Sequence, residues 1–278
     1  MAIRTFYWNK RHASIYKYYK NKIFNPDRIY LKHGNAGDIF NIDLIRYLYN
    51  QEPENILNNG KRLLLVGSIM NIVKEGDIIN GIGWKGNDMG DMSSVLSKLK
   101  IYGVRGPLTK SLFEKYDADL SDLKFELDPG LLIKEVYDIN LKKSKEKDVI
   151  FIPHFRDQKV RKGNFPKGIK VVNIDMHPKK LAKEILNAKV VYSSSLHGII
   201  FSHALNKPCV FVKPQTNEPI FKYRDYYLSI GQELPEAIND IDSINFFTDK
   251  PSLLSRTIGI DDFYFPSLNE LDQYGIVK

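Results

Sequence analysis

The sequence predicts an α/β protein made of two successive Rossmann-like halves, each containing a parallel sheet. Short buried strands alternate with helical segments along the chain, and this alternation is typical of parallel sheets. A charged stretch without an apolar pattern, residues 141–148, separates the two halves. We therefore predict domains at 1–143 and 144–278. The tail beyond residue 234 is less regular, and we expect it to pack back on the first domain.

The first half is predicted to contain a short strand followed by a loop, residues 33–38 (HGNAGD), that leads into a helix. Apolar residues recur at helical spacing after this loop, and Asp38 is well placed as the N-cap of the helix. Pro107 suits the first turn of a second helix, which should end near Tyr116. The strands of this half are expected at 29–31, 63–66, 77–79 and 101–104.

The second half contains the most informative stretch of the chain, around His197. A β-branched run at 190–192 precedes three serines, then Leu196-His197-Gly198, then an apolar segment with helical spacing. Open α/β sheets bind ligands in such strand-to-helix loops, and the helix N-terminus favours an anion. His197 can therefore bind an anion or move a proton, or it only caps the helix. The other strands are expected at 149–152, 170–174 and 209–212, with a helix at about 178–188.

Charge and cysteine content limit the classes of function. Lys and Arg total 41 against 33 Asp and Glu, so the formal charge is +8. This favours an anionic ligand, an acidic glycan, nucleic acid or an anionic membrane surface. A single cysteine, Cys209, excludes an internal disulfide framework and a Cys-based zinc site. The N-terminus has no apolar signal segment and the apolar runs are too short to span a bilayer, so we expect a cytoplasmic protein.

Several common motifs do not carry the function. Residues 81–86 (GIGWKG) fit G-x-G-x-x-G, but a turn rather than a helix is predicted after them, which disfavours a dinucleotide site. The D-x-D patterns at 117–119 and 240–242 lie in turn-like surroundings. The histidines show no paired metal-ligand spacing, and G-x-S-x-G is absent. We therefore expect neither a metal nor a resident cofactor.

What remains is a set of cationic side chains and histidines in loops at or after strand ends. Arginine forks match carboxylates and phosphates, and doubly wound domains bind ligands at the carboxyl ends of their strands. A surface salt bridge is the alternative for any one arginine. The set consists of Arg105, His154, Arg156 and His197, with Lys213, Lys222 and Arg224 further on.

The order of short motifs resembles the polysaccharide pyruvyl transferases, and more closely the ketal pyruvyltransferase of succinoglycan synthesis. The likeness extends over about residues 34–228, and an asparagine and a K-Y-R-D stretch follow the histidine helix. The motifs are Gly34-Asn35-x-Gly37-Asp38, Gly81-x-Gly83, Val104-Arg105-Gly106-Pro107, Asp128-Pro129-x-Leu131-Leu132, Ile152-Pro153-His154, Leu196-His197-Gly198, Pro208, Asn217 and Lys222-Tyr223-Arg224-Asp225. The resemblance implies a GT-B-like architecture with a cleft between the domains. It also implies phosphoenolpyruvate as donor and, as acceptor, a sugar diol of a bacterial surface polysaccharide or its lipid-linked precursor.

The resemblance also suggests roles for individual residues. His197 would be the general acid or a phosphate ligand, Arg105 a clamp on the donor anion, and His154 with Arg156 a second donor-side pair. Asp38 would be catalytic on the acceptor side, with the helix N-cap as its alternative role. Further substrate-binding candidates are Asn35, Ser195, Leu196, Gly198, Lys222 and Arg224. Many family members have arginine where this chain has Ser195, so Arg156, Lys222 or Arg224 would replace that cation.

Two other functions remain open. A nucleotide-sugar glycosyltransferase of GT-B type is the enzymatic alternative, although the predicted histidine helix has no acidic residue to hold a ribose. A non-catalytic protein that binds anionic glycans is the other, whereas nucleic acid is disfavoured because the basic residues form no dense, aromatic-interleaved run. Aromatic and basic residues at 6–11 and 15–20 also suggest peripheral membrane contact, unless they pack on the first domain.

Overall fold

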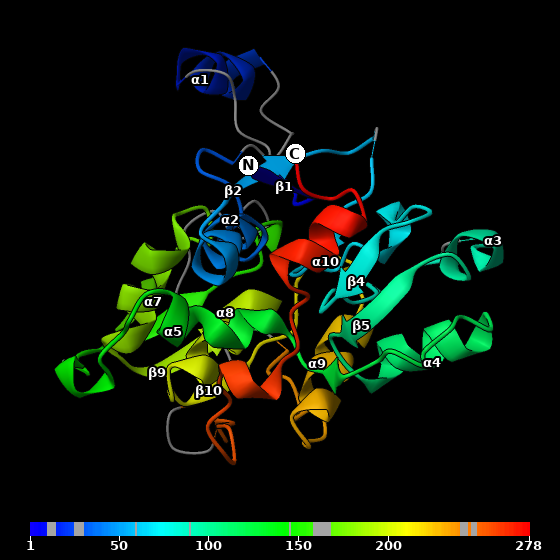
Figure 1. Ribbon diagram of the computed structural model, residues 1–278. Coiled ribbons are helices and arrows are strands. Elements are labelled where there is room, and N and C mark those ends of the chain that lie inside the picture. Colours follow the sequence, from blue (N-terminus) through cyan, green and yellow to red (C-terminus); the bar gives the residue numbers. More distant parts are fainter. Residues whose placement is uncertain are drawn as a thin grey trace.

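The chain folds into two parallel α/β halves that lie side by side (Figure 1). A six-stranded sheet has the order β2-β1-β3-β4-β5-β6, and a four-stranded sheet has the order β10-β9-β7-β8. Every strand pairing within the two sheets is parallel, which confirms the predicted class. The computed structural model describes residues 1–9, 15–24, 31–58, 60–88, 90–144, 146–157, 168–239, 244–245 and 249–278.

The first sheet and its helices occupy the chain up to Val136. Its strands are β1 (Ala2–Thr5), β2 (Glu52–Asn55), β3 (Leu63–Leu64), β4 (Ile78–Asn80), β5 (Lys100–Val104) and β6 (Phe125–Glu126). The helices are α1 (Ile15–Phe24), α2 (Ala36–Tyr49), α3 (Ser93–Leu96), α4 (Pro107–Lys115) and α5 (Ile133–Val136). Short 3₁₀ turns occur at Met70–Ile72, Pro129–Leu132 and Leu141–Lys143.

The second sheet begins immediately after the charged stretch. Its strands are β7 (Asp148–Ile152), β8 (Ile169–Val171), β9 (Ala188–Ser193) and β10 (Cys209–Phe211). The helices are α7 (Pro178–Leu186), α8 (Leu196–Ala204), α9 (Phe221–Ser229) and α10 (Leu268–Gln273), with a 3₁₀ turn at Ile260–Asp262. Helix α8 was predicted, but it begins at Leu196, before the apolar segment that predicted it, so His197 lies in its first turn rather than in the preceding loop, and Ser195 is its N-cap.

Three predicted details need correction. The cap of α2 is Asn35, whose side chain accepts a hydrogen bond from the Gly37 N–H at 3.0 Å, and Asp38 lies inside the first turn. The predicted strand at 170–174 ends earlier, at Val171. Of the strand predicted at 29–31, the first two residues lie outside the described ones, and Leu31 is not in a strand.

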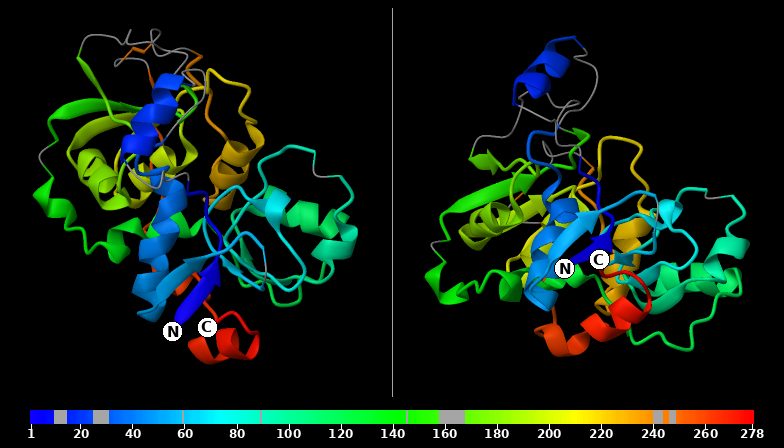
Figure 2. Two further views of the ribbon diagram at one scale, coloured as in Figure 1. Left: turned by 90° about the horizontal axis from the view of Figure 1, so that it is seen from above. Right: turned by 45° about the horizontal axis from the view of Figure 1, so that its top comes forward.

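The two halves share one continuous apolar core. Helix α2 contacts α7 and α8 of the second half, and the Phe40 ring meets the Phe201 ring edge-on at 5.5 Å. Helix α9 comes from the second half and packs on α4 of the first. Figure 2 shows the two halves from two further directions. This contact between the halves holds the loops of one half in place relative to those of the other, because a close-packed interface resists relative movement.

The carboxyl end of the chain returns to the first strand. Ala2 and Lys278 exchange two backbone hydrogen bonds of 2.9 Å, and the two termini lie together in Figure 1. Leu271 and Ile276 are buried, so the tail adds to the core of the first half.

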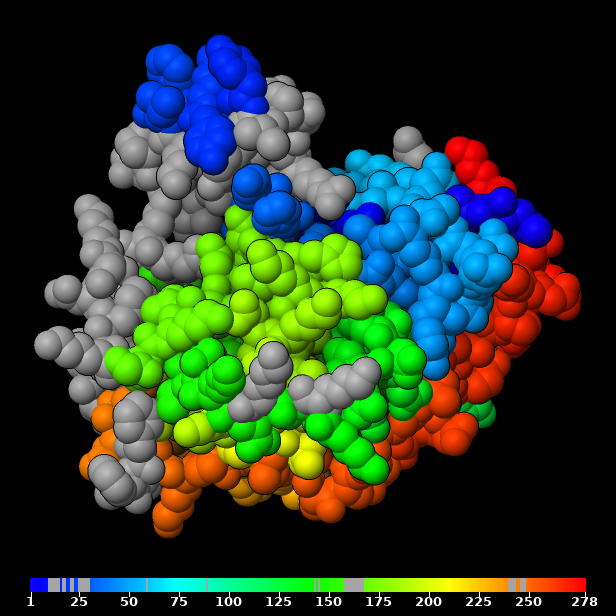
Figure 3. All heavy atoms as spheres, turned by 90° about the vertical axis from the view of Figure 1, so that its left-hand side faces the viewer, coloured from blue at the N-terminus to red at the C-terminus, as the bar shows by residue number. Residues whose placement is uncertain are grey.

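Helix α1 projects from the body of the molecule (Figures 1 and 3). Tyr16, Ile23 and Phe24 are each more than two-thirds exposed on it. Over the ranges described, no helix has the length and apolar character needed to cross a bilayer.

Candidate functional site

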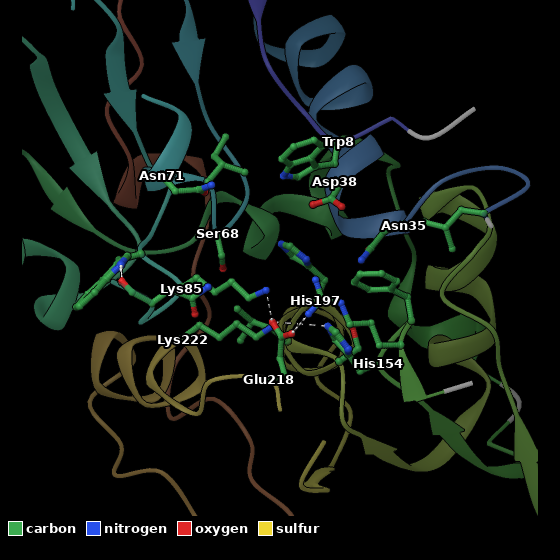
Figure 4. A pocket seen from close by; sticks show the side chains of 18 of the residues that line it. Trp8, Asn35, Asp38, Ser68, Asn71, Lys85, His154, His197, Glu218 and Lys222 are labelled. Atoms are coloured by element: carbon green, nitrogen blue, oxygen red, sulfur yellow. Dashed lines mark hydrogen bonds and ion pairs between the residues drawn. The ribbon is translucent and has the colours of Figure 1, made fainter. Parts of the chain in front are cut away.

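The principal pocket has a volume of about 410 Å³ and takes its walls from both halves (Figure 4). Strand-end loops, the first turns of α2 and α8, and the segment before α9 all contribute side chains. Its walls are formed by Trp8, Leu31, Asn35, Asp38, Ser68, Ile69, Asn71, Trp84, Lys85, Asn87, Asp88, His154, Phe155, Arg156, Ser195, Leu196, His197, Glu218 and Lys222. This is the location that ligands take in open α/β sheets.

The serines after β9 hold the two pocket histidines in place. The Ser194 hydroxyl accepts a hydrogen bond from the His154 N–H at 2.8 Å and donates one to Asp157 at 2.7 Å. The Ser193 hydroxyl donates to the carbonyl of Ile152 at 3.0 Å. The loop after β7 is thereby tied to the loop after β9, so that His154 and His197 both line the pocket.

Gly37 leaves the space that the His197 ring occupies. A Cβ atom at Gly37 would lie 1.9 Å from His197 Nδ1, far inside van der Waals contact. The first turn of α2 therefore touches the imidazole directly, and only glycine permits this approach. One wall of the histidine's site thus comes from the other half of the molecule.

Both histidines are neutral near pH 7. Burial, with a smaller contribution from Lys222, lowers the pKa of His197 to about 3, and the same two causes lower that of His154 to about 3. His197 Nε2 and His154 Nδ1 are buried and have no hydrogen-bond partner among the described residues. Buried polar atoms are rarely left unpaired, so these two nitrogens indicate a polar ligand.

A carboxylate surrounded by cations forms the floor of the pocket. Glu218 is buried and lies 2.6 Å from the Lys222 ammonium, 3.1 Å from that of Lys85 and 3.2 Å from the Arg156 guanidinium. The imidazole of His154 is 3.9 Å away. Figure 4 shows the carboxylate between Lys85, Lys222 and His154. Three cationic side chains face one carboxylate, so the group has an excess of positive charge and suits an anionic ligand.

Arg105 does not line the pocket, which corrects its assignment as a clamp on the ligand. Its guanidinium is buried behind the wall, 2.8 Å from Asp225 and 2.6 Å from the hydroxyl of Ser68, to which it donates. A further N–H donates to the carbonyl of Trp84. Ser68 and Trp84 themselves line the pocket, so Arg105 supports the wall through them and adds positive charge behind it.

The other predicted residues divide into two groups. Asn35, Asp38, His154, Arg156, Ser195, Leu196, His197 and Lys222 all line the pocket. Arg224 and Gly198 do not: Arg224 is exposed, and Gly198 packs against Ser193 and Ile152, where a Cβ would clash. Of the three cations expected to replace the family arginine, only Arg156 and Lys222 therefore face the ligand space.

Several pocket residues escaped the sequence prediction. Lys85 lies in the glycine-rich segment that was rejected as a dinucleotide motif, although its place after β4 is a signal of the same kind that identified His154. Glu218 was not predicted, because an anionic ligand favours cations and not a carboxylate. Its position four residues before Lys222, on the approach to α9, could have indicated the pair. Trp8 belongs to the aromatic and basic stretch at 6–11, which predicted membrane contact and not a place in the pocket that it lines.

The wall opposite the cations is polar and aromatic. Asp38 and Asn35 come from the first turn of α2, and Trp8 lies beside Asp38 in Figure 4. Asn71, Asn87 and Asp88 also line the pocket. Amides, carboxylates and an aromatic face are side chains that can bind the hydroxyls and apolar faces of a sugar. Within the described part of the chain, no group of three or more His, Cys, Asp or Glu side chains could hold a metal ion.

Comparison with known proteins identifies the family of the chain. A family model described as polysaccharide pyruvyl transferase matches residues 4–216. An uncharacterised protein of Acanthamoeba polyphaga mimivirus is 26% identical over 263 residues, covering 83% of this chain and 90% of that protein. No solved structure matches.

The fold and pocket define a two-sheet parallel α/β protein whose pocket is lined by residues of both halves, Lys85, Arg156 and Lys222 among them. The chain belongs to the polysaccharide pyruvyl transferase family, and it is therefore a transferase. The family match includes the loops that carry Asp38, His154 and His197, and it ends just before Glu218.

Proposed function

We propose that the protein is a ketal pyruvyltransferase of the succinoglycan type, using phosphoenolpyruvate as donor and a sugar diol of a surface polysaccharide as acceptor. The observation that carries this proposal is the cationic floor formed by Lys85, Arg156 and Lys222 beneath two unpaired histidine nitrogens. Phosphoenolpyruvate has a phosphate and a carboxylate, which two positive groups and a helix N-terminus suit. In this proposal the two parallel halves correspond to a GT-B-like arrangement, and the pocket to its cleft.

The chemistry needs three proton transfers. A proton is added to C3 of the enol, which becomes a methyl group, and a first sugar hydroxyl attacks C2 and loses its proton. The bond from C2 to the phosphate oxygen then breaks, the second hydroxyl closes the ring at C2, and its proton leaves with inorganic phosphate. His197 and the neighbouring cations supply the proton and the countercharge on the donor side. No other reactant is needed for this balance.

Asp38 is proposed as the group that accepts a proton from an attacking hydroxyl. It lines the pocket opposite the cations, in the first turn of α2, and is half-buried. A carboxylate in this position favours a neutral or cationic sugar over an acidic one, because two like charges repel in a partly desolvated site. Trp8 provides an aromatic face beside it for the sugar ring.

Incubation with phosphoenolpyruvate and a panel of glycosides tests the proposal directly. We expect phosphate release that depends on a glycoside with a suitable diol, together with a product whose mass has increased by a pyruvate ketal. Release from phosphoenolpyruvate alone should be slow, because the second bond at C2 needs the acceptor. Nucleotide sugars serve as the control donors. Glycosyl transfer from one of them, without phosphate release from phosphoenolpyruvate, would contradict the proposal and favour a glycosyltransferase.

We further propose that α1 contacts the cytoplasmic face of an anionic membrane and so brings the pocket near a lipid-linked acceptor. The helix has no acidic residue, and its Tyr16, Ile23 and Phe24 are exposed. Lysines near a bilayer surface attract anionic lipid, and apolar side chains insert at the interface. The basic Lys10 and Arg11, which belong to the same sequence pattern, lie outside the described residues.

Vesicle sedimentation measures this contact. We expect binding to phosphatidylglycerol-containing vesicles at low salt and weaker binding at high salt. Replacing Tyr16, Ile23 and Phe24 together by serine should weaken binding by about tenfold or more, because the inserted apolar area is lost. The matched control replaces Tyr47 and Leu57, exposed apolar residues elsewhere, by serine. A wild-type protein that does not bind anionic vesicles would contradict the membrane role alone.

A further inference from the structure

We propose that Glu218 is a positioning residue that keeps Lys222 charged within the pocket, so that a buried cation is available to the anionic donor. The inference rests on the proposed function, because it concerns the same donor. It adds to that function a role for an acidic residue, Glu218, in a site proposed to bind an acidic ligand.

Burial makes the charge of Lys222 costly. The side chain is 8% exposed, and its ammonium lies against the ring of Tyr223 with the centroid 5.1 Å away. An ammonium taken out of water without a partner tends to lose its proton. Lys222 occupies the first turn of α9 and lines the pocket.

Glu218 supplies the compensating charge. Its carboxylate accepts a hydrogen bond of 2.6 Å from Lys222, four residues along the chain. The carboxylate is itself only 2% exposed, so solvent screens the pair weakly. Such a short, enclosed ion pair favours the charged form of both members.

The other groups that face Lys222 in the described part of the chain supply no negative charge, and the positive ones disfavour its protonated form. Lys85 approaches from the loop after β4, and Arg105 lies behind the wall at the end of β5. Arg156 shares the carboxylate, and the neutral His154 and His197 supply no negative charge. Apart from Glu218, no carboxylate bonds Lys222 among the described residues.

The balance leaves Lys222 able to titrate near neutral pH. Burial lowers the pKa of Lys222 to about 8, while Glu218 opposes the shift and Lys85 and Arg105 add to it. Burial alone would raise the pKa of Glu218, but Lys222 and the other nearby positive groups hold it at about 2. Glu218 is thus ionised throughout the neutral range, and Lys222 is ionised below about pH 8. Loss of the carboxylate should therefore shift the ionisation of Lys222 to lower pH.

Lysine NMR in the Glu218→Gln variant tests this without any substrate. We expect the pKa of Lys222 to fall by about one unit or more, assigned by its absence in Lys222→Arg. Lys85→Met should raise the pKa of Lys222, because a neighbouring positive charge is removed. Glu126→Gln is the matched control, since it breaks the Lys110–Glu126 pair of 3.0 Å outside the pocket. An unchanged pKa in Glu218→Gln would overturn the proposal. If that variant does not fold, a pKa that fails to rise in Lys85→Met would overturn it.

Binding of phosphoenolpyruvate gives the second readout. Below about pH 6.5 the Glu218→Gln variant should bind the donor at least as tightly as wild type, because Lys222 is charged in both. At about pH 8 it should bind about fivefold more weakly, as the variant lysine loses its proton first. Glu218→Asp, which keeps the charge, should follow the wild-type profile. A loss of affinity equal at all pH values would indicate a merely structural role. Wild-type protein that binds no phosphoenolpyruvate would instead contradict the proposed function, and the NMR result would still stand.

Discussion

Replacing His197 by glutamine is expected to reduce turnover by about 10²–10⁴-fold, the contribution typical of a general acid or base. Glutamine keeps a similar size and can hydrogen-bond, but it cannot transfer the proton that the enol carbon needs. Because the cations on the pocket floor remain, affinity for phosphoenolpyruvate should change much less than kcat. Single-turnover kinetics together with direct donor binding separate the two effects.

The protonation state of His197 leads to a second expected result, proton uptake when the donor binds. The pKa of this histidine is about 3, lowered by burial and by the positive charges of Lys222 and Arg105, so the resting group is neutral. A bound phosphate and carboxylate offset those positive charges and raise the pKa. Donor binding should therefore take up protons in the wild type and fewer in His197→Gln, which calorimetry in buffers of different ionisation enthalpy detects.

The exposed His33 provides the control for this experiment, since His33→Gln removes an imidazole near the same α2 loop but outside the pocket wall. Near-normal turnover in His197→Gln would remove the residue from proton transfer. If proton uptake in His197→Gln equalled that of the wild type, His154 or Lys222 would be the group that takes up the proton.

The strand-to-helix pattern was sufficient to predict most of the second half and the position of its histidine. Runs such as 149–152 and 190–192 are apolar and β-branched because both faces of a parallel strand are buried. The pattern failed at β2, whose sequence EPEN contains a proline and two glutamates. That strand lies at the sheet edge, where a missing N–H and solvated charges are tolerated.

The sequence predicted those residues of the site that come after the ends of predicted strands. His154 and His197 follow strands directly and both line the pocket. The distinction between Arg105 and Arg156 was not available from the sequence, because both follow strands and both resemble anion clamps. It depends on Asp225, which comes from a helix more than a hundred residues after Arg105 and neutralises the first arginine.

Two motifs that carry the family likeness are in fact partners in space. Asp225 ends the K-Y-R-D stretch and Arg105 belongs to the V-R-G-P stretch, and their side chains form one buried ion pair. Gly106 allows this contact, because a Cβ there would lie 2.2 Å from the Asp225 carbonyl oxygen. Asp225 also accepts hydrogen bonds of 3.0 and 2.6 Å from the Thr109 N–H and hydroxyl. The pair therefore attaches α9, and with it Lys222, to the first half.

The Asp225→Ala substitution is expected to lower the free energy of unfolding by about 3–5 kcal/mol, because it leaves the Arg105 charge buried and uncompensated. Arg105 is 1% exposed and Asp225 is fully buried, so water cannot replace the lost carboxylate. Denaturant unfolding followed by tryptophan fluorescence measures the loss. Donor affinity should fall as well, since α9 positions Lys222.

Two controls distinguish this mechanism from a general sensitivity to mutation. Glu75→Ala breaks the exposed Lys98–Glu75 pair of 3.0 Å and should cost less than about 1 kcal/mol, as exposed pairs do. A double variant, Arg105→Met with Asp225→Leu, removes both charges and should recover much of the stability lost in Asp225→Ala. It should not recover donor affinity to the same extent, because the positive charge behind the wall and the hydrogen bond to Ser68 are gone. If Asp225→Ala were as stable as Glu75→Ala, the buried pair would not be what attaches α9 to the first half.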